Sequence, residues 1–321
     1  MDFTDFRAGA DDEGKRLDKI TRVLLPPQTG CFEAIRKRLV RLNGKKTAPD
    51  VRVKDGDVIN IASFLLSSEV PETTACPTIH FEDCFRNEHI RIIYKPRGIN
   101  VQNAVAGEMS IASAIKQEAQ AQGMQSLSFC PAPLHRLDAN TTGLLAVSQS
   151  AEGARWFTEA IKIHGIAKTY VAVAKGRIPS KTTWTDLLQD SPVEARTFHT
   201  VRVVTGPSSG ARKAVTTVIP LATGNCRGQP VTLAEYQIET GRKHQIRAQS
   251  SFHGFPLFGD SAYGGGSAIS DAAPFFLHAV RMGFPADNPL ELPPYVTADI
   301  PSDFDKFLNS VLIKWNIDRI I

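Results

Sequence analysis

Carboxylate, guanidinium and phenol side chains in three short segments have the chemistry for nucleophilic catalysis. The first segment, 135–143, reads HRLDANTTG and presents Asp138 just ahead of an apolar stretch. The second, 239–247, reads ETGRKHQIR and ends on Arg247, and the third opens at Lys168 and contains Tyr170. A bare carboxylate can serve as a nucleophile, a general base or a metal ligand. Asp138 is therefore the residue on which such chemistry would depend.

Each segment also has a purely structural interpretation, which spacing alone leaves open. A loop of Asp, Asn, Thr and Gly before a buried strand is commonly an Asx-type turn, and a Tyr in a strand commonly packs in the core. Three cations in 242–247 are typical of a solvated face or a phosphate grip. The residues after them are apolar enough for partial burial, and a buried Arg247 would need a carboxylate partner. Asp138 is a candidate for that partner.

Several other classes of site lack their signatures. The chain has no G-x-G-x-x-G, no Walker loop and no G-x-S-x-G, so a dinucleotide, ATP or serine-hydrolase mechanism has no support. Its five cysteines are scattered without a C-x-x-C pair. Its histidines form no H-E-x-x-H pair, so we expect neither a metal nor another cofactor; those considered are His135, His164, His244, His253 and His278.

Composition describes an ordinary globular chain. Of its 321 residues 42% are hydrophobic and 22% charged, which is too apolar for disorder. No apolar stretch approaches the ~20 residues of a membrane span. The acidic N-terminus lacks the apolar core of a secretory signal, so we expect a cytoplasmic protein without a membrane partner.

Charge is unevenly distributed along the chain. Between Lys15 and Lys54, twelve Lys and Arg oppose three Asp and Glu, a net charge of +9, so the remaining residues sum to −5. Such a basic module suits a polyanion, nucleic acid first. Arg38, Arg41 and Lys45 would lie on one face if a helix runs into the following turn.

Periodicity predicts two units. We expect a flexible leader at 1–14, a basic unit at 15–61, a linker at 62–79 and a second unit at 80–321. In the first, a helix over 29–42 precedes an Asn43-Gly44 turn and short strands at 51–53 and 58–61. The second should alternate strands with few helices, which favours an α+β fold with a mixed, mainly antiparallel sheet, flanking helices and a cleft. We expect strands at 90–94, 144–147, 169–174, 214–219 and 231–238, and helices at 110–123 and 154–165.

Six motifs follow one another along the second unit: YKPRGINV (94–101), HRLDANTTGLLAV (135–147), KTYVAVAKG (168–176), ETGRKHQIR (239–247), GFPLFGDSAYG (254–264) and FLHAVRM (276–282). In this order they resemble the RluA-type family of RNA pseudouridine synthases, over roughly residues 80–305. Thr142 stands where the family usually has Ser, and Gln249 and Phe255 replace common histidines. The basic unit resembles the alpha-L RNA-binding domain of the type in small-subunit ribosomal protein four, a small α/β domain.

The resemblance implies an isomerase that needs no cofactor and no metal. Asp138 would be the nucleophile, attacking either the anomeric carbon or the uracil ring, and Arg247 would hold it ionised. Tyr170 would stack on the flipped uracil and take the proton from its carbon 5. Arg136 would fill the gap left by the extruded nucleotide. The residues expected to contact RNA phosphates or position the RNA are Lys95, Arg242 and Lys243, with Arg38, Arg41 and Lys45 in the basic unit.

The expected partner is structured RNA, with large-subunit ribosomal RNA ahead of transfer RNA, and the expected state is a monomer. Two other classes stay open at this point. A non-catalytic RNA-binding or ribosome-assembly protein would be expected to lack Asp138, Tyr170 or Arg247, and all three are present. A hydrolase that uses Asp138 and water would release free base and gives the basic unit no role.

Overall fold

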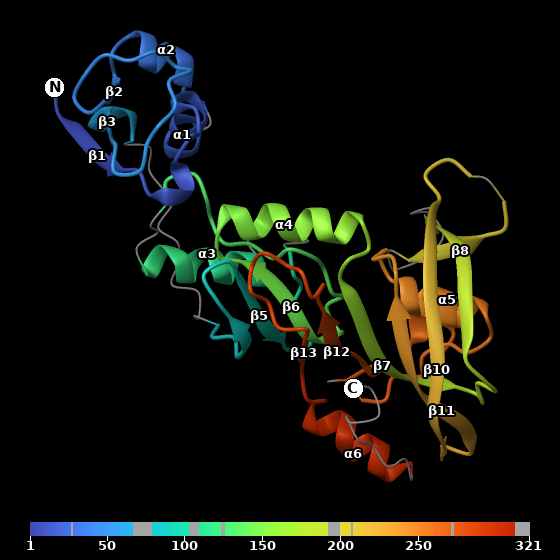
Figure 1. Cartoon of the computed structure of the whole chain (residues 1–321). Coiled ribbons are helices and arrows are strands. Elements are labelled where there is room, and N and C mark those ends of the chain that lie inside the picture. The colour runs from blue at the N-terminus through green and yellow to red at the C-terminus, as the bar shows by residue number, and fades with distance from the viewer. Residues whose placement is uncertain are drawn as a thin grey trace.

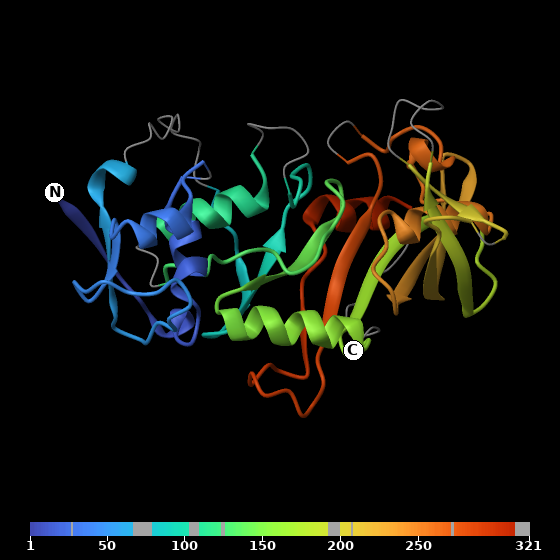
Figure 2. The same cartoon turned by 90° about the horizontal axis from the view of Figure 1, so that it is seen from above.

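The fold consists of a small N-terminal unit and a larger unit built on one long sheet (Figure 1). It was obtained as a computed structural model. In two perpendicular views the N-terminal unit lies at one end of the molecule, beside helix α3 and one end of helix α4 (Figures 1 and 2). The described residues are 1–26, 28–66, 79–102, 109–122, 126–191, 200–206, 208–270 and 273–311.

The N-terminal unit contains a three-stranded antiparallel sheet in the order β1-β3-β2. Apolar side chains from its strands and helices, among them Leu17, Ile35 and Ile59, form a core of its own. The elements are β1 (Phe3–Arg7), a 3-10 helix η1 (Ala10–Asp12), α1 (Leu17–Leu24), α2 (Cys31–Arg36), β2 (Val40–Leu42), β3 (Val58–Ala62) and η2 (Ser63–Leu65).

Three sequence expectations for this unit were wrong. Residues 3–7 are not a flexible leader, because β1 pairs along its length with β3. The helix expected over 29–42 ends at Arg36, and Arg38 then adopts a left-handed conformation with φ of 66°. Arg38, Arg41 and Lys45 therefore do not share a helical face. Of the strands expected at 51–53 and 58–61, only the second forms, as β3.

The hairpin turn at Asn43-Gly44 is confirmed. Both residues have positive φ, 51° and 73°, as a two-residue type I′ turn requires. Leu42 and Lys45 exchange backbone hydrogen bonds across it, each 3.0 Å long. Most of the linker expected at 62–79 lies outside the described residues.

The large unit is built on a mixed sheet in the order β4-β5-β6-β12-β7-β11-β10-β8-β9, with β13 beside β12. Within the described residues every pairing is antiparallel except that of β6 with β12, which confirms the predicted α+β class with a mainly antiparallel sheet. The strands are β4 (Asp83–Arg86), β5 (Ile90–Lys95), β6 (Thr142–Ser148), β7 (Ala167–Lys175), β8 (Thr182–Asp190), β9 (Val201–Val204), β10 (Arg212–Cys226), β11 (Gln229–Ile238), β12 (Leu277–Gly283) and β13 (Tyr295–Thr297).

Helices cover both faces of this sheet. The predicted N-cap at Ser110 is confirmed, since its hydroxyl accepts a hydrogen bond from the Ser113 amide, 3.1 Å away. The helix expected at 154–165 is observed over Ala151–Lys162. The helices are α3 (Ile111–Ala121), α4 (Ala151–Lys162), α5 (Gln245–Phe252), the 3-10 turn η4 (Ser261–Tyr263) and α6 (Ser302–Ser310).

Alternation along β7 shows how the core is divided. Tyr170 and Ala172 face a cluster that includes residues of α3 and α5, whereas Val171 and Val173 face the cluster that includes α6. A strand directs successive side chains to opposite faces, so Tyr170 lies on the same side as α5. This is the side on which the candidate site forms.

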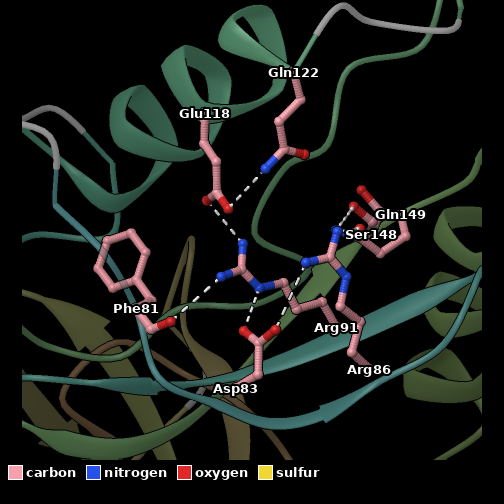
Figure 3. A network of polar contacts seen from close by, with 8 residues as sticks. All are labelled: Phe81, Asp83, Arg86, Arg91, Glu118, Gln122, Ser148 and Gln149. Carbon is pink, nitrogen blue, oxygen red and sulfur yellow. Dashed lines mark hydrogen bonds and ion pairs between the residues drawn. The ribbon is translucent and has the colours of Figure 1, made fainter.

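Arg91 connects α3 to the edge of the sheet (Figure 3). Its buried guanidinium donates to Asp83 of β4 at 2.5 Å and to Glu118 of α3 at 2.8 Å.

These contacts predict the effect of two substitutions on stability. Replacing Arg91 with Met removes the buried cation that contacts both carboxylates, so we expect the free energy of unfolding in urea to fall by about 3 kcal/mol. Arg86→Met removes the exposed neighbour, 3.7 Å from Asp83, and should cost less than about 1 kcal/mol. Equal losses in the two variants would contradict this role for Arg91.

Candidate active site

Three residues predicted to act together meet at one point of the fold. Asp138 lies in the loop before β6, Tyr170 on β7 and Arg247 in the first turn of α5. Arg247 Nη1 donates to Asp138 Oδ2 at 3.2 Å, across 109 positions of sequence. All three residues line a cavity of about 50 Å³. The predicted pairing of Asp138 with a buried arginine is therefore present.

The side chain of Lys95 holds the loop that carries Asp138. Lys95 Nζ donates to the carbonyls of Ala139 at 2.8 Å and Thr141 at 2.9 Å. Lys95 is fully buried, and burial lowers the pKa of its ammonium to about 7. The prediction that Lys95 contacts RNA was wrong, because a buried group at the end of β5 supports the Asp138 loop instead.

Gly143 allows this loop to enter the sheet. It has φ of 104° and lies opposite Ala279 of β12 in the parallel pair. A Cβ atom at this position would come within 2.2 Å of the Ala279 carbonyl oxygen. The glycine of the TTG sequence is therefore required for β6 and β12 to pair directly after the Asp138 loop.

Arg247 is held in place by a second carboxylate. Asp260, almost fully buried, accepts from Arg247 Nε at 2.7 Å and Nη2 at 3.0 Å. The rings of Tyr263 and Phe275 flank the guanidinium, with centroids 4.8 and 4.7 Å from its central carbon. Burial alone would lower the pKa of Arg247, but the hydrogen bonds and charge of Asp260 outweigh burial and raise it. The guanidinium is thus a fixed cation whose Nη1 amino group donates to Asp138.

His244 is a further neighbour of Asp138 to which sequence reasoning assigned no role. Its Nε2 lies 3.8 Å from Asp138 Oδ2, and its Nδ1 lies 2.9 Å from the Tyr263 hydroxyl. That hydroxyl also accepts a hydrogen bond from the amide of Val201, at 2.9 Å. Burial lowers the pKa of His244, so the ring beside Asp138 is neutral at neutral pH.

Tyr170 is buried and its phenol is protonated at neutral pH. Burial, with the charge of Asp138 adding to it, raises the pKa of the Tyr170 hydroxyl well above its usual range. The residue still lines the cavity beside Asp138. Its ring is therefore placed as a flat apolar wall for a bound group.

A wider cleft of about 900 Å³ opens beside Asp138 and is lined by many cations. Arg136, Arg242 and Lys243 are exposed there, as their predicted contact with RNA requires. The cleft is shared with Lys168, whose pKa is lowered by burial, and with Arg212. By contrast, Arg38, Arg41 and Lys45 lie in the N-terminal unit, where the Arg41 guanidinium is 4.2 Å from the Phe3 ring centroid. They do not join the site.

Gln249, which stands where the family commonly has a histidine, occupies a buried polar position close to the site. Its side-chain oxygen accepts from the Thr216 hydroxyl at 2.6 Å, and its amide donates to Asp186 at 2.6 Å. Gln245, one turn earlier in α5, donates to the same hydroxyl at 2.9 Å. These hydrogen bonds attach α5 to β8 through Asp186 and to β10 through Thr216. Gln249 therefore has a structural role at this position.

Two histidines near the site, the half-buried His135 and the fully buried His278, predict how the free energy of unfolding depends on pH. His135 Nε2 accepts the Ala146 amide at 3.0 Å, and His278 Nδ1 lies 2.8 Å from the Thr142 hydroxyl. Burial lowers the pKa of His135 to about 3 and that of His278 to about 4. As the pH falls, these histidines bind protons in the unfolded chain at a higher pH than in the folded one. The free energy of unfolding is therefore largest above pH 6.5 and decreases toward pH 4. We expect a loss on the order of 3 kcal/mol from His278 alone, measured by urea unfolding.

The matched variants for this pH test are His278→Asn and His80→Asn, the second at an exposed position. The dependence on pH between 7 and 4.5 should become shallower only in His278→Asn. An unchanged dependence in that variant would contradict the assignment to His278.

Within the described ranges, no group of three His, Cys, Asp or Glu side chains is arranged to hold a metal ion. The described helices are also too short or too polar to span a membrane.

Fold and site together define an enzyme that places a carboxylate, its cation and an aromatic ring at a basic cleft. Comparison with known families makes the class specific, since the RNA pseudouridylate synthase model matches residues 89–252. The chain belongs to this family, and the predicted RluA-type resemblance is confirmed. It is an RNA pseudouridine synthase, an isomerase that acts on RNA.

Relatives are similar over most of the chain. Ribosomal large subunit pseudouridine synthase C of Rickettsia bellii is 30% identical over 276 residues, covering 82% of this chain and 87% of the relative. The protein of the same name from Escherichia coli K12 is 27% identical, covering 86% of each. Human RNA pseudouridylate synthase domain containing 4 superposes with a TM-score of 0.58 at 23% identity, covering 73% of this chain and 94% of that one. The last comparison supports the fold alone.

Proposed function

We propose that this enzyme isomerises uridines of large-subunit ribosomal RNA and that Asp138 is its nucleophile. The observation that carries the proposal is the contact of Asp138 with Arg247, a cation fixed by Asp260, at a cavity that Tyr170 also lines. The names of the relatives support ribosomal RNA as the substrate.

The reaction needs only groups that this site holds. The carboxylate of Asp138 bonds to the anomeric carbon or to the uracil ring. The glycosidic bond between the anomeric carbon and N1 of the uracil breaks. The uracil turns, its carbon 5 bonds to the anomeric carbon, and the carboxylate leaves. Carbon 5 loses a proton and N1 gains one, so nothing is oxidised or reduced. The Arg247 guanidinium, hydrogen-bonded to Asp138, orients the attacking carboxylate and places a positive charge beside it.

Tyr170 is proposed to stack on the uracil and to take part in removing the carbon-5 proton. Because its raised pKa keeps the phenol protonated, Tyr170 must pass its own proton on before it accepts another. Asp138, released from the substrate, is the carboxylate suited to receive it. Arg136, exposed at the mouth of both cavities, would fill the gap left by the flipped nucleotide.

The N-terminal unit is proposed to bind RNA through its positive charge. Reversing the charges of Arg38, Arg41 and Lys45 should weaken RNA binding at least ~10-fold and lower its salt dependence. The turnover of bound RNA should stay the same. Filter binding at several salt concentrations measures both effects, and unchanged binding would exclude this role for the three residues.

The experiment for the proposed substrate is release of tritium from uridine labelled at carbon 5. Transcripts of large-subunit ribosomal RNA and of transfer RNA are compared with the wild-type enzyme, and products are digested to nucleosides. We expect release from ribosomal RNA with one pseudouridine formed for each tritium lost. Release from transfer RNA alone would overturn the substrate assignment.

A further inference from the structure

The first residues of the chain contact the catalytic unit through a buried carboxylate. Asp12, at the end of η1, has no exposed surface. Its two oxygens accept from the Leu127 amide at 2.9 Å, the Ser128 amide at 3.0 Å and the Ser126 hydroxyl at 2.9 Å. The Ser128 hydroxyl also donates to it. One side chain of the N-terminal unit thus accepts four hydrogen bonds from a segment more than a hundred residues away.

Neighbouring contacts strengthen this junction. Lys15 Nζ donates to the Ser128 hydroxyl at 2.9 Å, and Leu127 packs against the apolar core of the N-terminal unit. Asp11 accepts from the amide of Ala151 at 3.0 Å, the first residue of α4. A carboxylate is favoured there because the N-terminal end of a helix carries partial positive charge.

Helix α4 connects the junction to the active site. Its first residue contacts Asp11, whereas Ile161 and Lys162 at its other end line the wide cleft beside Asp138. In both views α4 runs from the N-terminal unit toward β7 (Figures 1 and 2). The twelve residues of α4 span ~18 Å. This length is about half the rise of one turn of a nucleic-acid helix.

We propose that Asp12 and Asp11 are positioning residues that hold the N-terminal unit at a fixed distance from the cleft, so that one RNA is bound at both places. The proposal rests on the RNA-binding role proposed above for the basic unit. A fixed second contact raises the effective concentration of the target uridine at the cleft. The preferred substrate is then a folded RNA that extends at least the length of α4 beyond the target.

The test compares Asp12→Ala with Glu13→Ala in the full chain. Both remove one negative charge from the same segment, but Glu13 is exposed. Tritium release is measured on a long ribosomal RNA transcript and on a hairpin with a stem of ~5 base pairs around the same uridine. In Asp12→Ala we expect KM for the long RNA to rise at least ~10-fold at unchanged kcat, with no change on the hairpin. Loss of a negative charge by itself would instead tighten RNA binding.

A second variant guards against simple misfolding of the N-terminal unit. Ser126→Ala with Ser128→Ala removes two donors from the catalytic side and should shift KM for the long RNA in the same direction, by a smaller factor. Hydrogen exchange of the Leu127 and Ser128 amides should accelerate in Asp12→Ala, while peptides from the N-terminal sheet stay protected. An unchanged KM for the long RNA despite faster exchange, or equal losses on both RNAs, would overturn the proposal. Failure of the basic unit to bind RNA would show separately, in the Arg38, Arg41 and Lys45 variant.

Discussion

Replacing Asp138 with Asn is expected to reduce tritium release by roughly 10⁴-fold or more. The amide is nearly the same size but is no nucleophile, and removing a nucleophile has effects of this order in other enzymes. The side chain is about one-fifth exposed and keeps a hydrogen bond from Arg247, so the fold should be preserved. RNA binding, measured in parallel by filter retention, should stay within about threefold of wild type.

Asp190→Asn is the matched control for this variant. Asp190 lines the same cleft and is largely exposed, so its loss makes the same change in charge at a place outside the proposed chemistry. We expect it to keep wild-type turnover. Comparable losses in the two variants would mean that the charge of the cleft matters and the position of Asp138 does not.

Replacing Arg247 with Met is the second large effect that we expect. The variant loses the cation beside Asp138, which should lower kcat by ~10²- to 10³-fold. It also leaves the buried carboxylate of Asp260 without a partner, which should lower the free energy of unfolding by about 3 kcal/mol or more. Activity assays and urea unfolding measure the two losses separately.

The double variant Arg247→Met with Asp260→Asn separates these causes. Removing the orphaned charge should recover most of the lost stability, because a neutral amide is less costly to bury. Activity should stay low, since Asp138 still lacks its cation. Recovery of activity together with stability would show that Arg247 supports the fold alone.

Part of the sheet could be predicted, namely β5, β6, β7, β10 and β11, because burial leaves apolar runs in the sequence, whereas β8, β9 and β12 were not predicted. The runs at 144–147 and 169–174 lie within β6 and β7, which are buried along most of their length. Helix α5 gave no such signal, since buried Gln245, Gln249 and Ser250 make its sequence polar. Its place depends on hydrogen bonds to other elements, which periodicity does not show.

The residues of the site could be predicted only where they belong to a sequence motif. Asp138 and Arg247 were paired from their motifs, but the contact of Asp260 with Arg247 depends on the path of the chain after α5. Lys95 was misassigned because a lysine near a Pro-Arg-Gly sequence looks solvated. Its burial follows from the meeting of β5 with the Asp138 loop, a contact between segments 44 positions apart.

The error over residues 1–14 has a physical cause. Residues 1–14 are polar and show no periodicity, so they were read as a leader. The strand β1 forms because β3 offers it a free edge, and Asp12 is buried because a distant segment supplies donors. The local sequence does not indicate that β1 pairs with β3 or that residues 126–128 bind Asp12.

The most direct test of the proposed chemistry is a single-turnover experiment with enzyme in excess over ribosomal RNA. Nucleosides are quantified after complete digestion, for the wild type and for Asp138→Asn, at concentrations at which both bind the RNA. We predict that the wild type converts uridine to pseudouridine without free uracil, and that Asp138→Asn forms neither product. Pseudouridine formed by Asp138→Asn at the wild-type rate would contradict the assignment of Asp138 as the nucleophile.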